Sequence, residues 1–437
     1  MQLFTATLRG WVHPSDAFIL LHKDDKHAFW LDRETHPSEK FSVIGASTHK
    51  IADADLGQIS SKLSTLSAIE DADMQLPFSW RPGLVGLINY EGDFEFLEID
   101  RAMVFDHENR CMYFLGYFDS KAHFERWHHA ALLRIGLTGG QVAQYVHERS
   151  GHAVPEVAHL LHSPEEYLRM IAQAQSHIAA GDVYQLCLTN QIQMQHEIDP
   201  LVAFLQLRRL NPAPYSTYLR LGTTAIVCAS PEQFLSVSKS GQISTKPIKG
   251  TRPRQDDEAA DVQVAQELAE NIKERAENLM IVDLMRNDFS VVAKPDSVSV
   301  ESLFQVESYA TVHQLVSTVT AQLAEGKTSV DALAAAFPGG SMTGAPKQRA
   351  MQLIHELEKS HRGAYSGVIG YFGFDGSAEF GMTIRTMVFE KNHDRHQVSI
   401  GIGGGITIDS DAQAELAETE LKARALLKVL GVASPWA

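Results

Sequence analysis

The stretch from Lys246 to Arg254 carries four cationic side chains in a chain whose formal net charge is −16. Lys249 lies inside this stretch, between an isoleucine and a glycine, where a strand is expected to end. Neighbouring cations and partial burial lower the pKa of a lysine amine, and the neutral amine is a nucleophile. Lys249 is therefore a candidate nucleophile. The alternative is an ordinary basic strand end that faces water.

Two pairs of glutamates have the spacing of metal ligands on helices. Glu274 and Glu277 are three residues apart, as are Glu415 and Glu418, so each pair shares one helix face. Lys422 follows the second pair by four residues. If the two helices meet across a cleft, the carboxylates could bind Mg²⁺, which takes one or two carboxylates plus the substrate. Alternatively, both pairs are solvated helix surface.

Three glycine-rich stretches could bring the backbone close to a ligand. The stretch 338–347 leads into a helix, whose N-terminus could hold an anion, although its spacing differs from that of a Walker A loop. A phosphate-binding NTPase is therefore a disfavoured alternative. Residues 401–406 allow close approach of a ligand to the backbone, and 363–367 place Tyr365 beside a tight turn. Ordinary turn geometry explains such clusters as well.

Arg385 interrupts an otherwise apolar strand that we expect over residues 381–390. A buried charge without a partner is costly. The planar guanidinium suits a substrate carboxylate, and an internal salt bridge would also explain the residue.

Composition excludes several classes of protein. The 437 residues are 44% hydrophobic and 21% charged, enough for a large core. No apolar run approaches the roughly 20 residues that span a bilayer, and the N-terminus lacks a signal-peptide pattern, so we expect a cytoplasmic protein without membrane contact. The cysteines, Cys111, Cys187 and Cys228, indicate neither disulfides nor zinc. A pI of about 5.6 argues against a nucleic-acid partner.

The elements that must position these residues follow from periodicity and caps. Short alternating runs predict strands over most of residues 1–118, including Phe18 to Leu21. The segment 136–162 has little periodicity and is interpreted as a linker or crossover. A capping pattern starts a helix at Ser163, and residues 258–286 predict one long helix. Strand runs with inserted helices, without regular βαβ alternation, predict an α+β fold with largely antiparallel sheets.

Taken together, the Ile248–Thr251 motif, the glutamate pairs and the glycine-rich stretches resemble the chorismate-utilising enzymes. This family includes anthranilate synthase component I, aminodeoxychorismate synthase component I, and the isochorismate and salicylate synthases. The resemblance covers roughly residues 163 to 430. It implies a large, mostly antiparallel two-sheet sandwich with helices packed outside. It also implies a divergent N-terminal region (1–135), the linker (136–162) and a chorismate-binding catalytic region (163–437), with the two regions packed as one globular unit.

The resemblance also assigns roles to single residues. Lys249, Glu232 and His313 match catalytic positions, with Glu232 as the general acid. Glu277 and Glu418 match ligands of Mg²⁺, with Glu274 and Glu415 behind them through waters. The positions that match substrate-binding residues are Tyr365, Arg385, Lys422, Gly403, Gly404, Gly405, Thr343, Gly344 and Thr251.

Lys249 favours one branch of the family. Anthranilate synthases typically carry alanine at this position, and a lysine marks aminodeoxychorismate synthase component I. Isochorismate and salicylate synthases typically have a lysine where this chain has Gln185. The serine of the family's tryptophan-binding motif is replaced by Lys23, which argues against tryptophan binding.

The resemblance therefore implies conversion of chorismate and ammonia to 4-amino-4-deoxychorismate through a covalent Lys249 adduct at C2, for 4-aminobenzoate and folate synthesis. No cysteine lies in a glycine-rich nucleophile turn, so we expect a separate glutamine amidotransferase subunit to supply ammonia. The alternatives are anthranilate synthase component I and a catalytically silent partner subunit.

Overall fold

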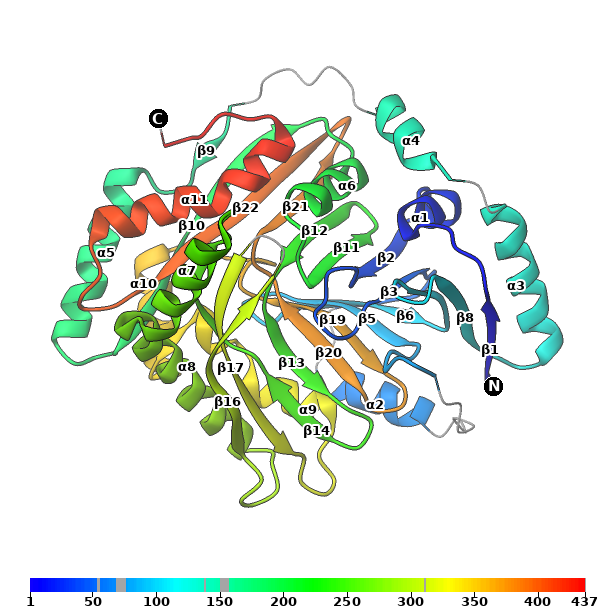
Figure 1. The fold of residues 1–437 in the computed structure, drawn as a ribbon, viewed down its shortest axis with the longest axis horizontal. Coiled ribbons are helices and arrows are strands. Elements are labelled where there is room, and N and C mark those ends of the chain that lie inside the picture. The colour runs from blue at the N-terminus through cyan, green and yellow to red at the C-terminus, as the bar shows by residue number, and fades with distance from the viewer. Residues whose placement is uncertain (53–55, 68–75, 137–138, 150–156, 310–311, 437) are drawn as a thin grey trace.

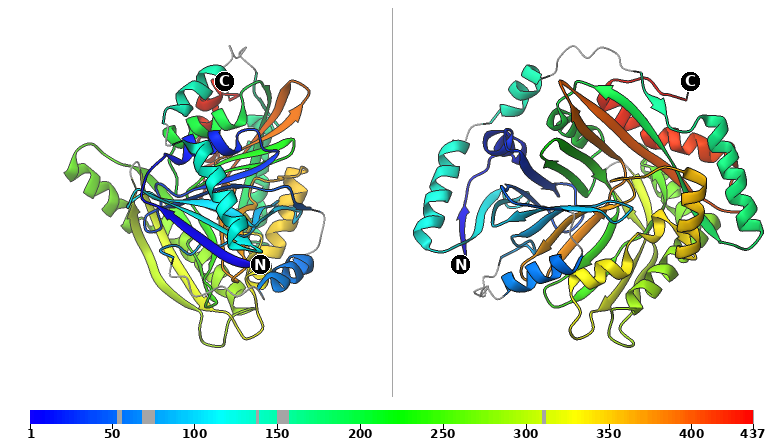
Figure 2. Two further views of the ribbon diagram at one scale, coloured as in Figure 1. Left: turned by 90° about the vertical axis from the view of Figure 1, so that its right-hand side faces the viewer. Right: turned by 180° about the vertical axis from the view of Figure 1, so that it is seen from behind.

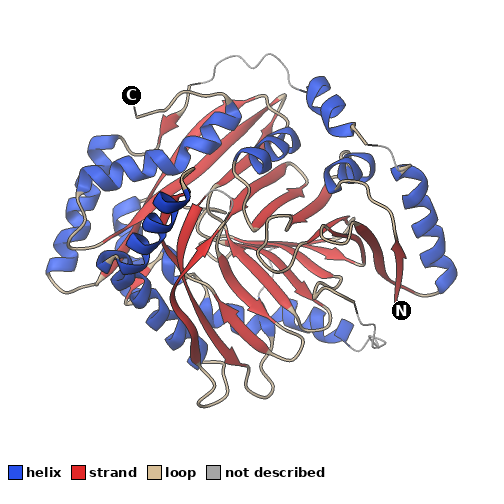
Figure 3. Cartoon of the chain, in the orientation of Figure 1, coloured by secondary structure: helices blue, strands red, loops and turns tan. Residues whose placement is uncertain are grey.

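Strands from distant parts of the sequence assemble into two large sheets, and helices lie around the outside (Figures 1 and 3). The computed structural model describes residues 1–52, 56–67, 76–136, 139–149, 157–309 and 312–436. Within these ranges one sheet has twelve strands and the other has ten. The pairings within both sheets are antiparallel. The predicted α+β class and two-sheet architecture are confirmed.

The first sheet joins the N-terminal region to the catalytic region. In spatial order its strands are β1 (Gln2–Leu8), β8 (Cys111–Phe118), β7 (Arg101–Asp106), β3 (Phe41–Ala46), β2 (His27–Asp32), β11 (Tyr215–Leu221), β12 (Thr224–Ser230), β21 (Thr386–Asn392), β22 (Arg395–Ile406), β10 (Gln185–His196) and β18 (Gly344–Ala345), with β9 (His159–Leu160) also paired to β10. The two regions meet where Asp32 of β2 lies opposite Ser216 of β11.

The second sheet also takes strands from both regions. In spatial order they are β15 (Ile248–Pro253), β17 (Val312–Gln322), β14 (Gln242–Thr245), β13 (Gln233–Val237), β20 (Ala378–Met382), β19 (Val368–Gly373), β5 (Gly83–Ile88), β6 (Phe94–Ile99) and β4 (Lys50–Ala52), with β16 (Ser299–Ser308) also paired to β17. Here β5 of the N-terminal region pairs with β19, with Ile88 opposite Val368.

The alternation of side chains along a strand divides the apolar residues between two cores. Phe29 and Leu31 of β2 belong to the core that the first sheet shares with the second. Ala28 and Trp30 point the other way, into a core beneath the outer helices. This is the period of two expected for a strand buried on both faces. The first sheet is therefore covered on both sides.

Helices cover the outer faces of the sheets. In chain order they are α1 (Pro14–His22), α2 (Leu56–Ser67), α3 (Lys121–Ile135), α4 (Gln141–Arg149), α5 (Pro164–Ala179), α6 (Pro200–Leu210), α7 (Glu258–Glu270), α8 (Ile272–Ser290), α9 (Ser329–Ala336), α10 (Lys347–Glu358) and α11 (Ala412–Leu430). α11 packs on β22, α10 on β10 and α8 on β17. Seen from behind, α2 and α9 lie side by side (Figure 2). Among the described residues, no helix is both long and apolar enough to cross a membrane.

Three local expectations can be compared with the structure. The capping box at Ser163 is present and starts α5. The strand expected at Phe18 to Leu21 is wrong, because Pro14 and a cap from the His13 side chain start helix α1 there. The segment 136–162, expected to be a linker, contains α4 and β9; residues 137–138 and 150–156 lie outside the described residues. The division into regions remains a prediction.

The long helix expected over residues 258–286 is two helices. The chain breaks at Asn271, whose backbone is extended and whose side chain accepts a hydrogen bond from the Glu274 N–H. Asparagine is a favoured N-cap for this reason. The break starts a new helix, α8, which carries Glu274 and Glu277.

Candidate active site

Lys249 lies on β15 beside a β-bulge. The register of β15 against β17 shifts between Lys249 and Thr251. Gly250 between them has φ 74°, and an added Cβ would lie 2.7 Å from a Leu268 methyl and 3.0 Å from the Glu274 carboxyl carbon. Only glycine suits this conformation and this contact. The Lys249 side chain is 14% exposed, and its Nζ lies 3.8 Å from Oε2 of Glu277.

The other three cations of the basic stretch are paired with acids. Lys246 Nζ lies 3.2 Å from Glu307 Oε1. Arg252 pairs with Glu267 and, at 3.4 Å, with Glu274. Arg254 lies 2.7 Å from Asp261. These pairs give the three cations structural roles.

Lys249 and Gln185 converge on a glycine of β22. A Cβ added to Gly405 would lie 3.3 Å from Lys249 Nζ and 2.5 Å from Gln185 Nε2. The Gln185 side chain is fully buried, and neither its nitrogen nor its oxygen has a hydrogen-bond partner among the described residues. A buried amide without a partner is costly, so this geometry favours a polar ligand beside Lys249. From the sequence, Gln185 stands out only because isochorismate and salicylate synthases typically have a lysine at this position.

Glu232 is buried just after β12. Burial raises the pKa of this carboxyl to about 7, although the Ser341 hydrogen bond, the Lys249 charge and the Ile248 backbone act to lower it. A carboxyl with a pKa near 7 holds its proton part of the time at neutral pH. Glu232 can therefore act as a general acid, the role that its motif predicts.

Carboxylates from α8 and α11 gather around shared ammonium groups. Lys273 Nζ lies 3.8 Å from Glu277 Oε1 and 3.7 Å from Glu415 Oε1, so one cation bridges the two helices. Burial raises the pKa of Glu277 despite the charges of Lys249 and Lys273. Burial acts the same way on Glu418, but the charge and hydrogen bond of Lys422 outweigh it and lower the pKa of Glu418.

The predicted metal-shell glutamates lie near one another, because the charges of Glu274 and Glu415 both act to raise the pKa of Glu277. Glu277, Glu415 and Glu418 share the charge of Lys273. Glu274 instead accepts from Arg252. Within the part of the chain that the structure describes, no group of three or more His, Cys, Asp or Glu side chains is arranged to hold a metal ion. The metal ligation therefore remains a prediction.

The predicted glycines of β22 lie directly under polar side chains. Lys422 Nζ donates to the Gly403 carbonyl at 2.7 Å. A Cβ on Gly404 would lie 3.2 Å from Glu415 Oε2 and 3.8 Å from Lys422 Nζ. Gly405 lies against Lys249, so the backbone of Gly403 to Gly405, here called the glycine surface, contacts both lysines.

Arg385 lies in the connection between β20 and β21, where we had expected a continuous strand. Its φ is 50°, which is uncommon for a residue with a Cβ. Burial lowers the pKa of its guanidinium, and no hydrogen bond or ion pair to its side chain is present among the described residues. Residues held in such conformations cluster at ligand sites. A guanidinium without an internal partner fits a substrate carboxylate better than an internal salt bridge.

Tyr365 and Thr343 lie on loops around the same strands. The Tyr365 ring lies on Gly401, where an added Cβ would be 1.9 Å from the ring. Thr343 is fully buried and donates its hydroxyl to the Gly339 carbonyl at 3.2 Å. Gly344 follows with φ 150°, and its Cβ position is blocked by the Gln185 carbonyl at 2.1 Å. Glycine is thus required for β18 to pair with β10.

His313 and Thr251 lie in the β15–β17 part of the second sheet. One ring nitrogen of His313 lies 2.9 Å from Asp261 Oδ1 and the other 2.8 Å from Ser308 Oγ. Thr251 is exposed and accepts from Gln314 at 3.4 Å. Their catalytic and substrate-binding roles remain predictions.

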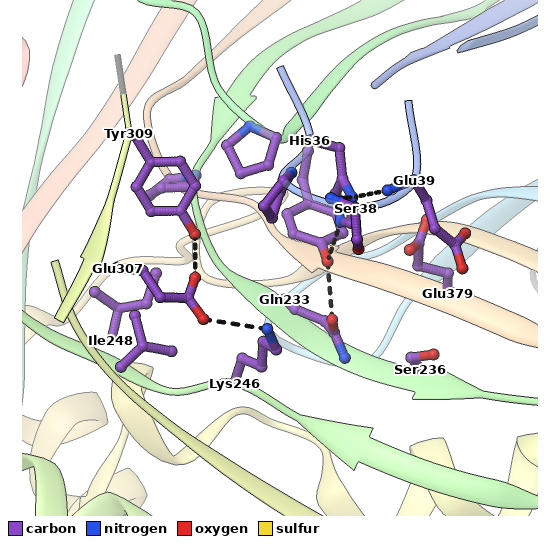
Figure 4. A pocket seen from close by; sticks show the side chains of 15 residues that line it. His36, Ser38, Glu39, Gln233, Ser236, Lys246, Ile248, Glu307, Tyr309 and Glu379 are labelled. Atoms are coloured by element: carbon purple, nitrogen blue, oxygen red, sulfur yellow. Dashed lines mark hydrogen bonds and ion pairs between the residues drawn. The ribbon is translucent and has the colours of Figure 1, made fainter. Parts of the chain in front are cut away.

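A cavity of about 120 Å³ lies beside the segment that carries Lys249 (Figure 4). Lys246 and Ile248 line it, together with Glu307, Tyr309 and Gln233. The Tyr309 hydroxyl donates to Glu307 at 2.6 Å, and Glu307 is also paired with Lys246. Lys246 and Glu307 thus neutralise each other, and the carboxylates of Glu39 and Glu379 also line the cavity.

The α+β sandwich carries a candidate site with a buried acid, a lysine, the glycine surface and an arginine that has no partner among the described residues. The chain belongs to the family of chorismate binding enzymes, whose model matches residues 26–428.

The curated relatives that this chain resembles include aminodeoxychorismate synthases and anthranilate synthases. The chain is 38% identical over 459 residues to aminodeoxychorismate synthase of Streptomyces griseus, a match that covers 96% of this chain and 63% of the relative. It is 38% identical over 438 residues to aminodeoxychorismate synthase component 1 of Salmonella typhimurium, covering 96% and 91%. Anthranilate synthase component 1 of Streptomyces coelicolor is 42% identical over 262 residues, which are 60% of this chain. The chain thus spans less than two thirds of the Streptomyces griseus relative.

Solved structures share the fold. Anthranilate synthase component I from Streptococcus pneumoniae is 26% identical, with a TM-score of 0.71 over 98% of this chain and 92% of that one. The menaquinone-specific isochorismate synthase of Escherichia coli has a TM-score of 0.74 at 16% identity, covering 98% of this chain and 94% of that one, which supports the fold alone.

Proposed function

We propose that the chain is the chorismate-aminating component of an aminodeoxychorismate synthase, which makes 4-amino-4-deoxychorismate for 4-aminobenzoate and folate synthesis. The observation that carries this proposal is the position of Lys249, whose amine lies against Gly405 and 3.8 Å from Glu277. Beside it is the Gln185 amide, which has no hydrogen-bond partner among the residues that the structure describes. The named aminodeoxychorismate synthase relatives, matched over 95–96% of this chain, support it.

In the first step the neutral Lys249 amine forms a bond to C2 of the chorismate ring. The ring double bond shifts, the C4–O bond breaks, and Glu232 donates its proton so that the hydroxyl leaves as water. A buried carboxyl with a pKa of about 7 suits this donation. The covalent intermediate divides a difficult substitution into two easier ones.

In the second step ammonia attacks C4 and the double bond shifts back. The C2–N bond breaks, Lys249 leaves as a neutral amine, and the Glu232 carboxylate takes the proton that the new ammonium releases. Chorismate and ammonia thus give 4-amino-4-deoxychorismate and water, and both side chains return to their starting states.

We assign the two carboxylates of the substrate to the cations and loops around the site. Arg385 supplies a guanidinium that has no partner in the described part of the chain, and Lys422 supplies an ammonium beside Gly403. Tyr365, Thr343, Gly344 and the amides of Gly403 to Gly405 would complete the binding surface. These groups hold the ring so that C2 faces Lys249.

We further propose Mg²⁺ at the carboxylates of α8 and α11. The fit is supported by Lys273, whose ammonium already lies between Glu277 and Glu415 as a single shared cation. Glu277 and Glu418 would bind the ion directly, with Glu415 and Glu274 behind them. When bound, Mg²⁺ would neutralise carboxylate charge and polarise the departing hydroxyl.

Ammonia would come from a glutamine amidotransferase component. The Salmonella relative is named component 1, which implies another component. The three cysteines of this chain are buried, and none lies in a glycine-rich nucleophile turn. We therefore assign glutamine hydrolysis to a separate partner.

The test is the product formed from chorismate with Mg²⁺ and ammonium. We expect 4-amino-4-deoxychorismate, which 4-amino-4-deoxychorismate lyase converts to 4-aminobenzoate. Anthranilate as the product would instead identify the second candidate, anthranilate synthase component I, which shares the fold and 42% identity over part of the chain.

A further inference from the structure

Arg362 lies just after α10 and is 6% exposed. Its Nε donates to Glu358 Oε2 at 2.9 Å, and its Nη2 donates to Glu358 Oε1 at 2.6 Å. Both side chains of this bidentate pair are almost fully buried. Neither residue stands in a motif that suggests chemistry.

The remaining donors of the guanidinium reach three separate chain segments. Nη1 donates to the Met342 carbonyl at 2.7 Å and to Ser366 Oγ at 3.4 Å. Nη2 donates to the Cys187 carbonyl at 2.8 Å, across 175 positions in the sequence. Each of these three acceptor residues is next to a residue that we propose binds the substrate. Met342 precedes Thr343, and Ser366 follows Tyr365. Cys187 lies opposite Gly405 in the first sheet.

The partner carboxylate adds a fourth connection. Glu358 Oε1 accepts from the backbone N–H of Thr189 at 2.8 Å and from its hydroxyl at 2.9 Å. Thr189 lies opposite Gly403 in the first sheet. The ion pair therefore binds both ends of the strand segment that backs the glycine surface.

Two residues of the N-terminal region also contact Arg362. The Arg362 guanidinium lies 4.4 Å from the centre of the Tyr90 ring. Glu91 accepts from the backbone N–H groups of Arg362 and Gly363 at 2.8 and 3.1 Å. The strand pairing of β5 thus places two side chains of the N-terminal region at the base of the catalytic site.

A buried ion pair is a weak source of stability, because desolvation offsets the attraction and apolar residues often serve as well. The planar guanidinium of Arg362 supplies geometry instead, because its rigid donors fix several acceptors in one plane. We propose that Arg362 is a positioning residue that aligns the 342–344, 365–366 and 185–189 segments to receive chorismate. This inference rests on the proposed function.

The test replaces the pair by neutral residues. The double variant Glu358→Gln with Arg362→Met retains an acceptor for Thr189 and leaves no buried charge without a partner. It removes the guanidinium donors that reach the three segments. The matched control is Arg33→Met with Glu379→Gln. Arg33 also forms a largely buried ion pair, with Nη2 3.1 Å from Glu379 Oε2. It likewise donates to two backbone carbonyls, those of Asp32 and Ser216, and lies 4.8 Å from the Tyr215 ring.

We expect the Kd for chorismate, measured by calorimetry without ammonia, to rise about tenfold or more in the Glu358/Arg362 variant, equivalent to about 1.4 kcal/mol. The control should stay within about twofold of the wild type at a comparable melting temperature. Chorismate binding by the Glu358/Arg362 variant as tight as that of the control would overturn the inference. Absence of chorismate binding by the wild type would instead overturn the proposed function.

Hydrogen exchange tests the same inference without a ligand and with a milder variant. Arg362→Lys keeps the charge beside Glu358 but cannot reach all three segments. We expect faster exchange of the Cys187 and Ser366 amides, which are bonded to the Thr343 and Thr383 carbonyls. Unchanged exchange at both amides would contradict the positioning role even if the double variant does not fold.

Discussion

At the scale of single residues, Lys249 differs from its cationic neighbours in what surrounds it. Lys246, Arg252 and Arg254 form ion pairs at 3.4 Å or less, and one of their acidic partners is Glu274. Lys249 lies farther from its acid, 3.8 Å from Glu277, and faces a glycine and an amide that has no hydrogen-bond partner among the described residues. The sequence pattern predicts a basic stretch, but only the bulge at Gly250 explains why one of its cations turns inward.

Lys249→Ala should therefore remove the nucleophile without disturbing the strand. We expect the rate of 4-amino-4-deoxychorismate formation to fall about 10³-fold or more, because the covalent route is lost. Mass spectrometry of peptides from trapped wild-type enzyme should locate an adduct on Lys249. The same adduct mass in the variant would refute the nucleophile role. Lys246→Ala, which removes a paired cation of the same stretch, is the control.

Glu232 should give the reaction a descending limb in its pH profile. The acid form is the proton donor, and its pKa is about 7, so kcat should fall as pH rises through about 7. Glu232→Gln should lower kcat by about 10²- to 10⁴-fold and abolish this limb. A limb that persists in the variant would assign the proton to another group.

The same pKa has a consequence for stability. Because burial raises the pKa of Glu232, the folded state favours the proton, and the wild type loses stability as pH rises from about 4.5 through about 7. Glu232→Gln cannot ionise. We therefore expect the difference in melting temperature, variant minus wild type, to increase between pH 5 and pH 8; a constant difference would show that the carboxyl ionises freely.

At the scale of elements, the sequence predicts those features that depend on residues close together in the chain, such as helix spacing and helix caps. Glu415 and Glu418 share a helix as their spacing requires, and Ser163 starts α5 as its cap requires. The break at Asn271 was missed because helix formers on both sides outweigh one capping residue. Arg362 was missed for a different reason: its acceptors belong to other elements, and only the assembled fold brings them together.

The meeting of α8 and α11 predicts competition between Lys273 and a divalent ion. Lys273→Gln should tighten Mg²⁺ binding about two- to fivefold by calorimetry, since partly exposed ion pairs are worth about 0.2–1 kcal/mol. Lys121→Gln, which breaks an ordinary surface pair with Glu125 on α3, should leave the affinity unchanged. Weaker Mg²⁺ binding by Lys273→Gln would mean that the lysine supports the ion instead of competing with it.

At the scale of the whole molecule, neither sheet belongs to one region. The first sheet crosses from the N-terminal region to the catalytic region at β2 and β11, and the second does so at β5 and β19. Both sheets therefore take strands from residues 1–135 and from residues 163–437. Tyr90 and Glu91 carry the connection to the catalytic site.

This topology predicts that the chain unfolds as one unit. A fragment of residues 163–437 alone would leave β11 and β19 as open edges and expose apolar residues that β2 and β5 cover. We expect calorimetry of the full chain to give one transition, with near-ultraviolet circular dichroism and tryptophan fluorescence changing together. The fragment should show no cooperative transition. Two separate transitions, or a fragment that melts cooperatively, would show that the catalytic region folds independently. Chorismate binding by that fragment would show that the contacts from Tyr90 and Glu91 are dispensable.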